Sequence, residues 1–275
     1  MQVGDTLLPN AFVGSSREGL RYAHAIAKSL KHQFNVTLWN KPGTFEPSGF
    51  TLESLIAFTD RYDYGLFVFT ADDIVKYRGK KYPVSRDNVI FEAGLFFGAL
   101  GRENCFLFVS GAKKLRLPSD FSGLTHLPFK ESRKRHPQDR HILKLVEGPC
   151  SVIRDHCKKS DRWGLNGKWK QVWSVKSKNY PKRNPSEADV AVFGSRFRAE
   201  WDVKKEGRYK LIARIGEHRM ITGFWSGPHK HSYHGSCQLM VSPDSTKISG
   251  KWVGFRTNGK VESDRWEWSR PKRRA

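Results

Sequence analysis

The sequence is poor in cysteine and has no long apolar run. None of its four cysteines belongs to a Cys-x-x-Cys pair, so we expect neither a zinc site nor a disulfide framework. No segment approaches the ~20 apolar residues of a membrane helix, and the N-terminus lacks the charged and apolar regions of a signal peptide. We therefore expect a cytoplasmic protein with no membrane partner and no metal site.

Common motifs for binding nucleotides and nucleic acids are also missing. The sequence contains neither a Gly-x-Gly-x-x-Gly fingerprint nor a Gly-Lys-Ser/Thr phosphate loop. It shows no RRM, KH or helix-turn-helix signature either. Any nucleotide site in this chain must therefore be of another kind.

The charge balance is strongly basic. There are 49 Lys+Arg against 27 Asp+Glu, a net charge of +22. Residues 1–160 hold 24 basic and 16 acidic residues, and residues 161–275 hold 25 and 11, so +14 lies in the last 115 residues. Such a field attracts anions, whether nucleic acid, nucleotides or lipid headgroups. The basic tail 270–274 is interpreted as a solvated end.

The length fits two domains, which we place at 1–160 and 161–275. In the first, apolar strands at 10–13, 36–39, 64–70 and 105–109 alternate with helices expected at 18–34, 51–62, 88–100 and 141–158, the last interrupted at Gly148-Pro149. Residues 75–85 are expected to form a polar loop. This alternation predicts an α/β domain of flavodoxin-like type, with a parallel sheet and any site at the strand carboxyl ends.

The segment 88–100 contains only two polar residues, Asn88 and Glu92, so it predicts a helix buried on every side. Gly94 and Gly98 would let another backbone or a ligand approach it closely. An ionised carboxylate in such a helix must be paired, protonated or open to a cleft. Two interpretations follow: Glu92 forms a structural ion pair with Arg86 or Arg102, or it serves chemistry in a cleft.

Several polar and aromatic residues are expected at the same rim as Glu92. Gly14, Ser15 and Ser16 follow the first strand and precede a helix, where they could hold a phosphate or ribose or simply cap the helix. Trp39 and Phe45 could stack on a base or merely pack. Asp72, with Asp73, follows the strand at 64–70, where it could contribute to the site or only shape a turn.

These residues resemble a known family. The resemblance covers roughly residues 9–130 and is carried by six segments: Phe12-Val13-Gly14-Ser15-Ser16, Val36-Thr37-Leu38-Trp39, Thr51-Leu52-Glu53-Ser54-Leu55, Phe67-Val68-Phe69-Thr70, Arg86-Asp87-Asn88 through Glu92, and Leu117-Pro118-Ser119-Asp120. In this order they are similar to the TIR-like domain of predicted bacterial nucleotide-binding proteins. That family includes the TIR domains fused to STING and to other nucleotide sensors in anti-phage signalling.

The resemblance implies NAD+ glycohydrolysis, with NAD+ as substrate and no cofactor. Glu92 falls on the family's essential glutamate in its Asn-x-x-x-Glu segment and is the implied catalytic residue. The implied substrate-binding residues are Gly14, Ser15, Ser16, Trp39, Phe45, Asp72, Arg86 and Asn88. Arg86 could either orient Glu92 or bind phosphate. The resemblance also implies a homo-oligomer, because such enzymes generally complete their active sites between subunits.

Residues 161–275 change in character. Short alternating runs at 168–175, 191–203, 209–215, 220–225, 236–241, 247–255 and 265–268, with a repeated Gly-x-Trp at 167–169, 223–225 and 250–252, predict an all-β antiparallel barrel. A barrel of about eight strands can hold one small ligand. With its charge, the expected ligand is an anionic signal, a cyclic nucleotide or oligonucleotide. The candidate contacts are Arg196, Arg198, Trp201, Arg214, Arg219, Trp225 and Arg256.

The alternative for this half is a solvated basic surface over a tryptophan-rich core. His229, His231 and His234 cluster without the Cys or carboxylate companions of a metal site. The leading hypothesis is an NAD+-cleaving anti-phage effector activated by a nucleotide bound to the β domain. Two alternatives stay open: a nucleic-acid-binding module with a TIR-like oligomerisation scaffold, and another N-glycosidic enzyme such as a nucleoside hydrolase.

Overall fold

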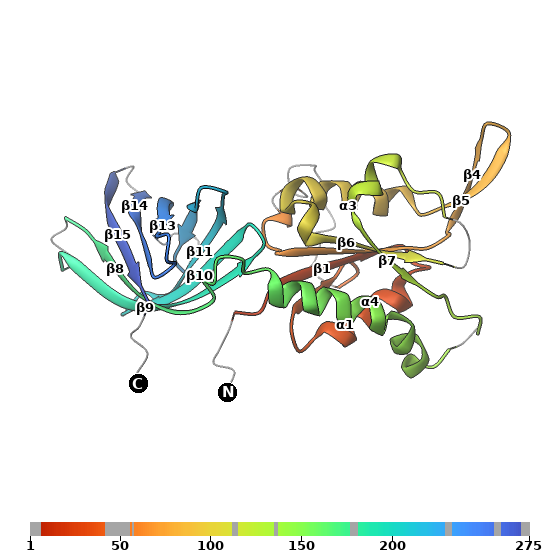
Figure 1. Ribbon diagram of the computed structural model, residues 1–275, viewed down its shortest axis with the longest axis horizontal. Helices are drawn as coiled ribbons and strands as arrows, with labels where there is room; N and C mark the ends of the chain where they lie inside the picture. Colours follow the sequence, from red (N-terminus) through yellow and green to blue (C-terminus); the bar gives the residue numbers. More distant parts are fainter. Residues whose placement is uncertain are drawn as a thin grey trace. The chain divides into compact units, whose positions relative to one another are not determined.

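The computed structural model describes residues 7–41, 56, 58–111, 115–134, 137–176, 181–228, 233–255 and 260–270. The chain divides into two compact units at residue 160. Residues 8–159 form an α/β domain, and residues 160–275 form a β domain (Figure 1). Each is described separately.

The α/β domain is built on a wholly parallel sheet, as predicted, but the sheet has five strands and not the four expected, because β7 was not predicted. Its strand order is β2-β1-β3-β6-β7. The six residues of β3 are all buried, as expected of a central strand covered on both faces. The strands are β1 (Asn10–Ser15), β2 (Asn35–Leu38), β3 (Tyr64–Phe69), β6 (Cys105–Ser110) and β7 (Thr125–Phe129).

Helices cover both faces of this sheet. Helices α1 (Leu20–Leu30) and α4 (Asp139–Lys159) pack together on one face, and α3 (Asp87–Leu100) lies on the other (Figure 1). Short 3-10 helices at Arg102–Asn104 and Ser119–Gly123 lead into β6 and β7. Of the helix predicted at 51–62, only residues 56 and 58–62 lie within the described part of the chain.

The prediction that the 88–100 helix is buried on every side is wrong. Its buried face consists of Val89, Ala93, Phe96 and Leu100, whereas Phe91 is 53% exposed. A Cβ added to Gly94 or Gly98 would meet no atom of the described residues within 4 Å. The two glycines therefore lie on the outer face of α3, where no described backbone approaches them closely.

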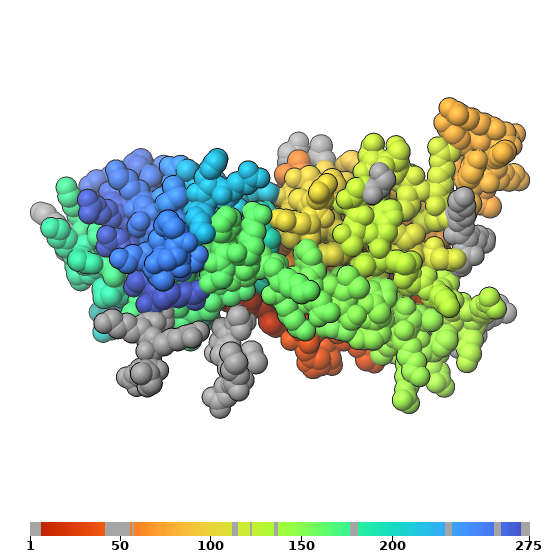
Figure 2. All heavy atoms as spheres, viewed as in Figure 1, coloured from red at the N-terminus to blue at the C-terminus, as the bar shows by residue number. Residues whose placement is uncertain are grey.

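Two further expectations are corrected. The polar loop at 75–85 is a hairpin, β4 (Asp73–Tyr77) and β5 (Lys80–Val84). Arg78 (φ 47°) and Gly79 (φ 77°) form its tip, and two left-handed residues are what a tight hairpin turn requires. Figure 2 shows the hairpin projecting from the α/β domain in orange.

The helix at the end of this domain is not interrupted at Gly148-Pro149. Pro149 lies inside one continuous α4, which buries Ile142, Val146, Cys150 and Ile153 along one stripe. Because buried residues lie on both sides of the proline, packing holds the two halves in line despite the lost backbone hydrogen bond.

The β domain is a closed eight-stranded antiparallel barrel, which confirms the predicted architecture. Each strand pairs with the next along the chain, and the last pairs with the first. The predicted strand 191–203 is two strands, separated by a turn at Gly194 (φ 63°). The strands are β8 (Gly167–Ser174), β9 (Arg183–Phe193), β10 (Arg196–Val203), β11 (Gly207–Ile215), β12 (Met220–Ser226), β13 (His234–Val241), β14 (Lys247–Phe255) and β15 (Val261–Ser269).

The repeated Gly-x-Trp motif has a packing explanation at two of its positions. A Cβ on Gly223 would lie 2.3 Å from the Ile212 carbonyl oxygen, and one on Gly250 would lie 2.1 Å from that of Gln238. Neighbouring strands therefore approach too closely for any side chain there. The tryptophans two residues later, Trp225 and Trp252, are buried inside the barrel.

Candidate active site

A cleft of about 450 Å³ opens where β1 and β2 end and α3 begins. This is the carboxyl edge of a parallel sheet, the usual place for a ligand in open α/β folds. Its volume lies within the range of small-molecule sites. The lining residues are Ser15, Ser16, Arg17, Glu18, Trp39, Arg86, Asn88, Val89 and Glu92.

Glu92 lines this cleft, one helical turn after the buried Val89. A Cβ added to Gly14 would lie 3.2 Å from Glu92 Oε2 and 2.8 Å from the Phe67 ring. The carboxylate is thus held against bare backbone at the end of β1. Burial raises the pKa of Glu92 from 4.5 to about 7. At neutral pH the group is poised between its acid and carboxylate forms.

Arg86 does not pair with Glu92. Its Nη2 lies 3.3 Å from Glu18 Oε1, and its Nε lies 3.2 Å from Asp73 Oδ2. Within the described residues, no ion pair or hydrogen bond joins Glu92 to Arg86, Arg102 or any other group. The ion-pair interpretation of Glu92 is therefore wrong, and the cleft accounts for its position.

Hydrogen bonds fix one wall of the cleft, which is formed by Ser15, Ser16 and Trp39. The Trp39 indole Nε1 donates to Ser15 Oγ at 2.9 Å, which fixes the ring next to the end of β1. Ser16 Oγ accepts from the Gly19 backbone N–H at 3.0 Å and lies 3.3 Å from Thr70 Oγ1. Ser16 therefore holds the turn that leads into α1, whose N-cap residue is Gly19, and it also lines the cleft.

Six predicted substrate-binding or catalytic residues line the cleft: Ser15, Ser16, Trp39, Arg86, Asn88 and Glu92. Gly14 lies directly beneath Glu92. Asp72 does not line the cleft; its carboxylate accepts from the Arg86 backbone N–H at 3.4 Å, just before α3 begins. Phe45 lies outside the described residues.

Sequence reasoning missed Arg17 as a cleft residue. The Arg17 side chain is exposed, and it forms no ion pair with any of the described residues. Arg86, by contrast, is already neutralised by two carboxylates. The position of Arg17, directly after Ser16 at the start of a helix, was the signal that could have identified it.

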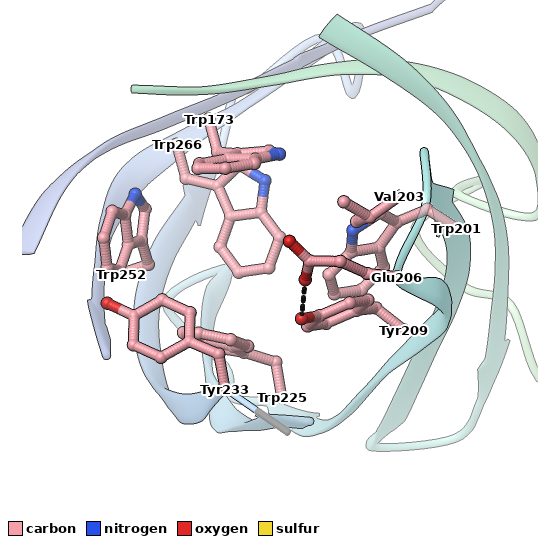
Figure 3. Close-up of a pocket in the computed structure, with 9 residues that line it drawn as sticks. All are labelled: Trp173, Trp201, Val203, Glu206, Tyr209, Trp225, Tyr233, Trp252 and Trp266. Carbon is pink, nitrogen blue, oxygen red and sulfur yellow. Dashed lines mark hydrogen bonds between the residues drawn. The ribbon is translucent and has the colours of Figure 1, made fainter. Parts of the chain in front are cut away.

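The β domain has a pocket of its own inside the barrel (Figure 3). Trp201 and Trp225 line it, as predicted for ligand contacts. The other described lining residues are Trp173, Val203, Glu206, Tyr209, Tyr233, Trp252 and Trp266. None of these described residues is basic.

The predicted arginines lie elsewhere in the β domain. Arg196 is buried, and Arg198 lies 3.8 Å from Glu200. Arg214 is exposed on the outer side of β11. Arg219 donates to the Ser242 carbonyl oxygen at 2.9 Å and so holds a turn. Arg256 lies outside the described residues, so the structure does not assemble these side chains into an anion site around the two tryptophans.

Two searches of the described residues concern other kinds of site. They contain no group of three or more His, Cys, Asp or Glu side chains arranged to hold a metal ion. His234 stacks on Phe255, while His229 and His231 lie outside the described part. No described helix is both long and apolar enough to cross a membrane.

Comparison with known proteins places the cleft in a recognised domain. Residues 10–131 match the family model described as "CAP12/Pycsar effector protein, TIR domain". The chain is 36% identical over 147 residues to the Pycsar effector protein BcPycTIR of Burkholderia cepacia (53% of this chain, 46% of the relative). It is 40% identical over 145 residues to XpPycTIR of Xanthomonas perforans (52% and 46%).

A third relative is the CD-NTase-associated protein 12 of Niabella drilacis, 38% identical over 122 residues (43% of this chain, 38% of the relative). The chain thus spans about half the length of the curated relatives it matches, or less. All cleft residues fall inside the matched segment, whereas the barrel falls outside it.

Proposed function

Since residues 10–131 are a TIR domain of the CAP12/Pycsar effector family of anti-phage proteins, we propose that this domain cleaves the nicotinamide–ribose bond of NAD+. The proposal rests chiefly on one observation. Glu92 is a half-buried carboxyl without a cation partner among the described residues, and it faces a cleft of about 450 Å³. An acid in that setting is a candidate for chemistry.

The reaction suits a single carboxylate. Nicotinamide leaves from NAD+ as a neutral molecule and needs no proton. Positive charge develops on the ribose as the glycosidic bond breaks, and an ionised Glu92 beside it would stabilise that charge. Burial removes part of the water around this carboxylate, so the stabilisation is stronger than it would be in solvent. Water then attacks the ribose to give ADP-ribose, or the adenine attacks to give a cyclised product.

Other cleft residues have matching roles in this proposal. Trp39, fixed by its bond to Ser15, offers a ring to a base. Arg17 and the hydroxyls of Ser15 and Ser16, beside the start of α1, are suited to the diphosphate and ribose. Asn88 lies one turn before Glu92 and can bind a ribose hydroxyl.

We further propose that a nucleotide signal, acting through the β domain, switches this activity on in an assembled homo-oligomer. The name CD-NTase-associated protein, carried by a relative, supports a link to nucleotide signalling. None of the described residues that line the barrel pocket is basic, whereas the outer surface of the barrel carries cations. Lys251 and Arg265 lie directly opposite each other there on β14 and β15.

Nicotinamide release tests the proposal. The full chain, at high concentration, is incubated with NAD+ alone and with each member of a panel of cyclic nucleotides. Release that requires a nucleotide and disappears in Glu92→Gln is the expected result. No release under any condition would contradict NAD+ cleavage. Release from nucleosides but not from NAD+ would favour another N-glycosidic enzyme.

A further inference from the structure

We infer that the outer face of the barrel, on strands β11 to β15, binds a single strand of nucleic acid. One base stacks on the exposed ring of Phe224, and phosphates bind to the cations beside it. The inference goes beyond the nucleotide signal proposed above, with which it shares only the cation pair of Lys251 and Arg265. It does not depend on NAD+ cleavage.

An exposed aromatic ring lies within this face. Side chains alternate along β12, so Gly223 and Trp225 are buried while Phe224 points outward and is 76% exposed. Directly opposite Phe224 lie Ile212 on β11, which is 40% exposed, and the small Ser236 on β13. Large apolar side chains that stay exposed next to one another mark a binding surface, whereas a single one needs no explanation.

Beside the exposed ring, a row of polar and basic side chains crosses five strands. Thr222 on β12 lies opposite Arg214 on β11 and Gln238 on β13. Gln238 in turn lies opposite Lys251 on β14, and Lys251 lies opposite Arg265 on β15. All five side chains are exposed. The row therefore places three cations on the same face as the aromatic ring.

Lys251 and Arg265 form a cation pair that the described residues do not neutralise. Neither side chain has an ion-pair partner among them. Glu267, which follows on the same face of β15, lies 3.6 Å from Arg183 instead. Like charges directly opposite each other on neighbouring strands destabilise a sheet. A phosphate bound between the two cations would relieve this repulsion.

The strands around the ring are free of acidic residues. Strands β11, β12, β13 and β14 hold five Lys or Arg residues and no Asp or Glu. Strands β9 and β10, by contrast, hold four acidic residues. Arg208 and Lys210 of β11 pair with Glu200 of β10. The cations that remain for a ligand therefore lie towards β14 and β15, where a polyanion meets attraction without local repulsion.

The combination of ring and cations favours a single-stranded nucleic acid over other polyanions. Neighbouring strands lie about 4.8 Å apart and successive outward residues about 6.6 Å, so the Cα atoms of Phe224 and Lys251 are roughly 12 Å apart. A ligand that contacts both must extend over more than one nucleotide, and small β-barrel domains bind single strands of ~4–16 nucleotides. Every base has a flat face that can stack on a ring, whereas an acidic peptide offers charge without such faces.

Fluorescence anisotropy titration of the full chain tests the inference with two matched strands. One is an oligothymidylate of about twelve nucleotides, and the other has the same sugars and phosphates but no bases. We expect the oligothymidylate to bind about tenfold more tightly, because only this strand can stack on Phe224. Phe224→Ala should remove the difference, since it should weaken the oligothymidylate about tenfold and leave the abasic strand unchanged.

The charge contribution is measured from the salt dependence of binding. Lys251→Gln combined with Arg265→Gln should lower the slope of log Kd against log salt by roughly 1.4, about 0.7 for each cation lost. Lys28→Gln combined with Lys31→Gln removes the same charge at the end of α1 and should leave the slope unchanged. Phe91→Ala removes an exposed phenylalanine from the α/β domain and should bind both strands like the wild type.

Several results would overturn the inference. Equal binding of the two strands, or binding that ignores Phe224→Ala, would mean that no base stacks on this face. Polyglutamate that binds as tightly as the oligothymidylate would favour an acidic protein partner instead. Phe224-dependent binding of phosphatidylserine vesicles, without binding of either strand, would assign the face to a membrane surface. Loss of self-association in Phe224→Ala, again without strand binding, would assign it to a second copy of this chain.

These outcomes are separate from those of the proposed function. Strand binding is measured without NAD+, so it would stand even if no nicotinamide were released. If a cyclic nucleotide activated cleavage while neither strand bound, the inference would fail and the proposed function would remain.

Discussion

Replacing Glu92 by glutamine should stabilise the α/β domain at neutral and alkaline pH while it abolishes activity. Burial raises the pKa of Glu92 from 4.5 to about 7, so the folded domain holds its proton more tightly than the unfolded chain does. Between these two values the folded state binds one proton and the unfolded state none. Stability therefore falls as pH rises from about 4.5 to about 7, and stays lowered above that.

The size of the effect follows from the same two values. At about 1.4 kcal/mol per pKa unit, the rise to about 7 corresponds to about 3 kcal/mol. The Glu92→Gln variant avoids the free-energy cost of burying a charge. It still buries a polar amide, and the cost of that burial offsets part of the gain in stability. We expect Glu92→Gln to be more stable than the wild type by about 2 kcal/mol at pH 8, and nearly equal to it near pH 4.5.

Urea unfolding of both proteins across this pH range, followed by a signal from the α/β domain, provides the measurement. An ion pair would give the opposite result, because removing one partner of a buried pair typically costs 3–5 kcal/mol. A Glu92→Gln protein that is less stable at every pH would therefore refute the reasoning. It would mean that a cation holds the ionised carboxylate.

Four further predictions concern the cleft and the barrel. The kcat/KM for NAD+ cleavage should rise with pH through about 7, because the ionised form of Glu92 is the active one, and a pH-rate profile checks this. Gly14→Ala should lose most activity, since its Cβ would lie 2.8 Å from the Phe67 ring and 3.2 Å from Glu92; steady-state kinetics alongside a folding check will show it. Arg17→Ala should raise KM roughly tenfold with little change in kcat, whereas Arg21→Ala, one turn further along α1 and outside this cleft, should not. Gly223→Ala should destabilise the barrel by roughly 3 kcal/mol, because the new Cβ would lie 2.3 Å from a backbone oxygen of the neighbouring strand. Thermal unfolding measures this effect, and Gly216→Ala, whose Cβ would lie 3.9 Å from the nearest atom, should be close to neutral.

The parts of the fold that could be predicted are those where one local signal decides the structure. The unbroken apolar run at 64–69 predicts a strand that is covered on both faces, and the structure shows it as β3. Glu92 stood out because Asn88 is the only other polar residue in the segment 88–100. The hairpin at 73–84 could not be predicted so easily, since its tip needs a left-handed conformation at Arg78, which an arginine rarely adopts.

The β-domain ligand contacts show where an available signal was missed. Along β10 the side chains of Phe197, Ala199 and Trp201 are buried in the barrel core. Because side chains alternate along a strand, Arg196 and Arg198 must face the opposite side from Trp201. Grouping residues by type placed arginine and tryptophan in one site. Grouping them by odd and even position would have separated them.

The position of Glu92 also explains why α3 can carry an uncompensated acid. A buried side chain the size of leucine or phenylalanine contributes about 1.5–3 kcal/mol, so Phe96 and Leu100 together exceed the cost of about 3 kcal/mol estimated for Glu92. Phe96 stacks on Phe12 of β1 with ring centroids 4.8 Å apart, which anchors the helix to the strand that ends at Gly14. The same contact that offsets the acid thus fixes its distance from the strand end. A helix with a weaker apolar face would have to pair the acid with a cation or lose its position at the cleft, and either change would remove the reactive carboxylate.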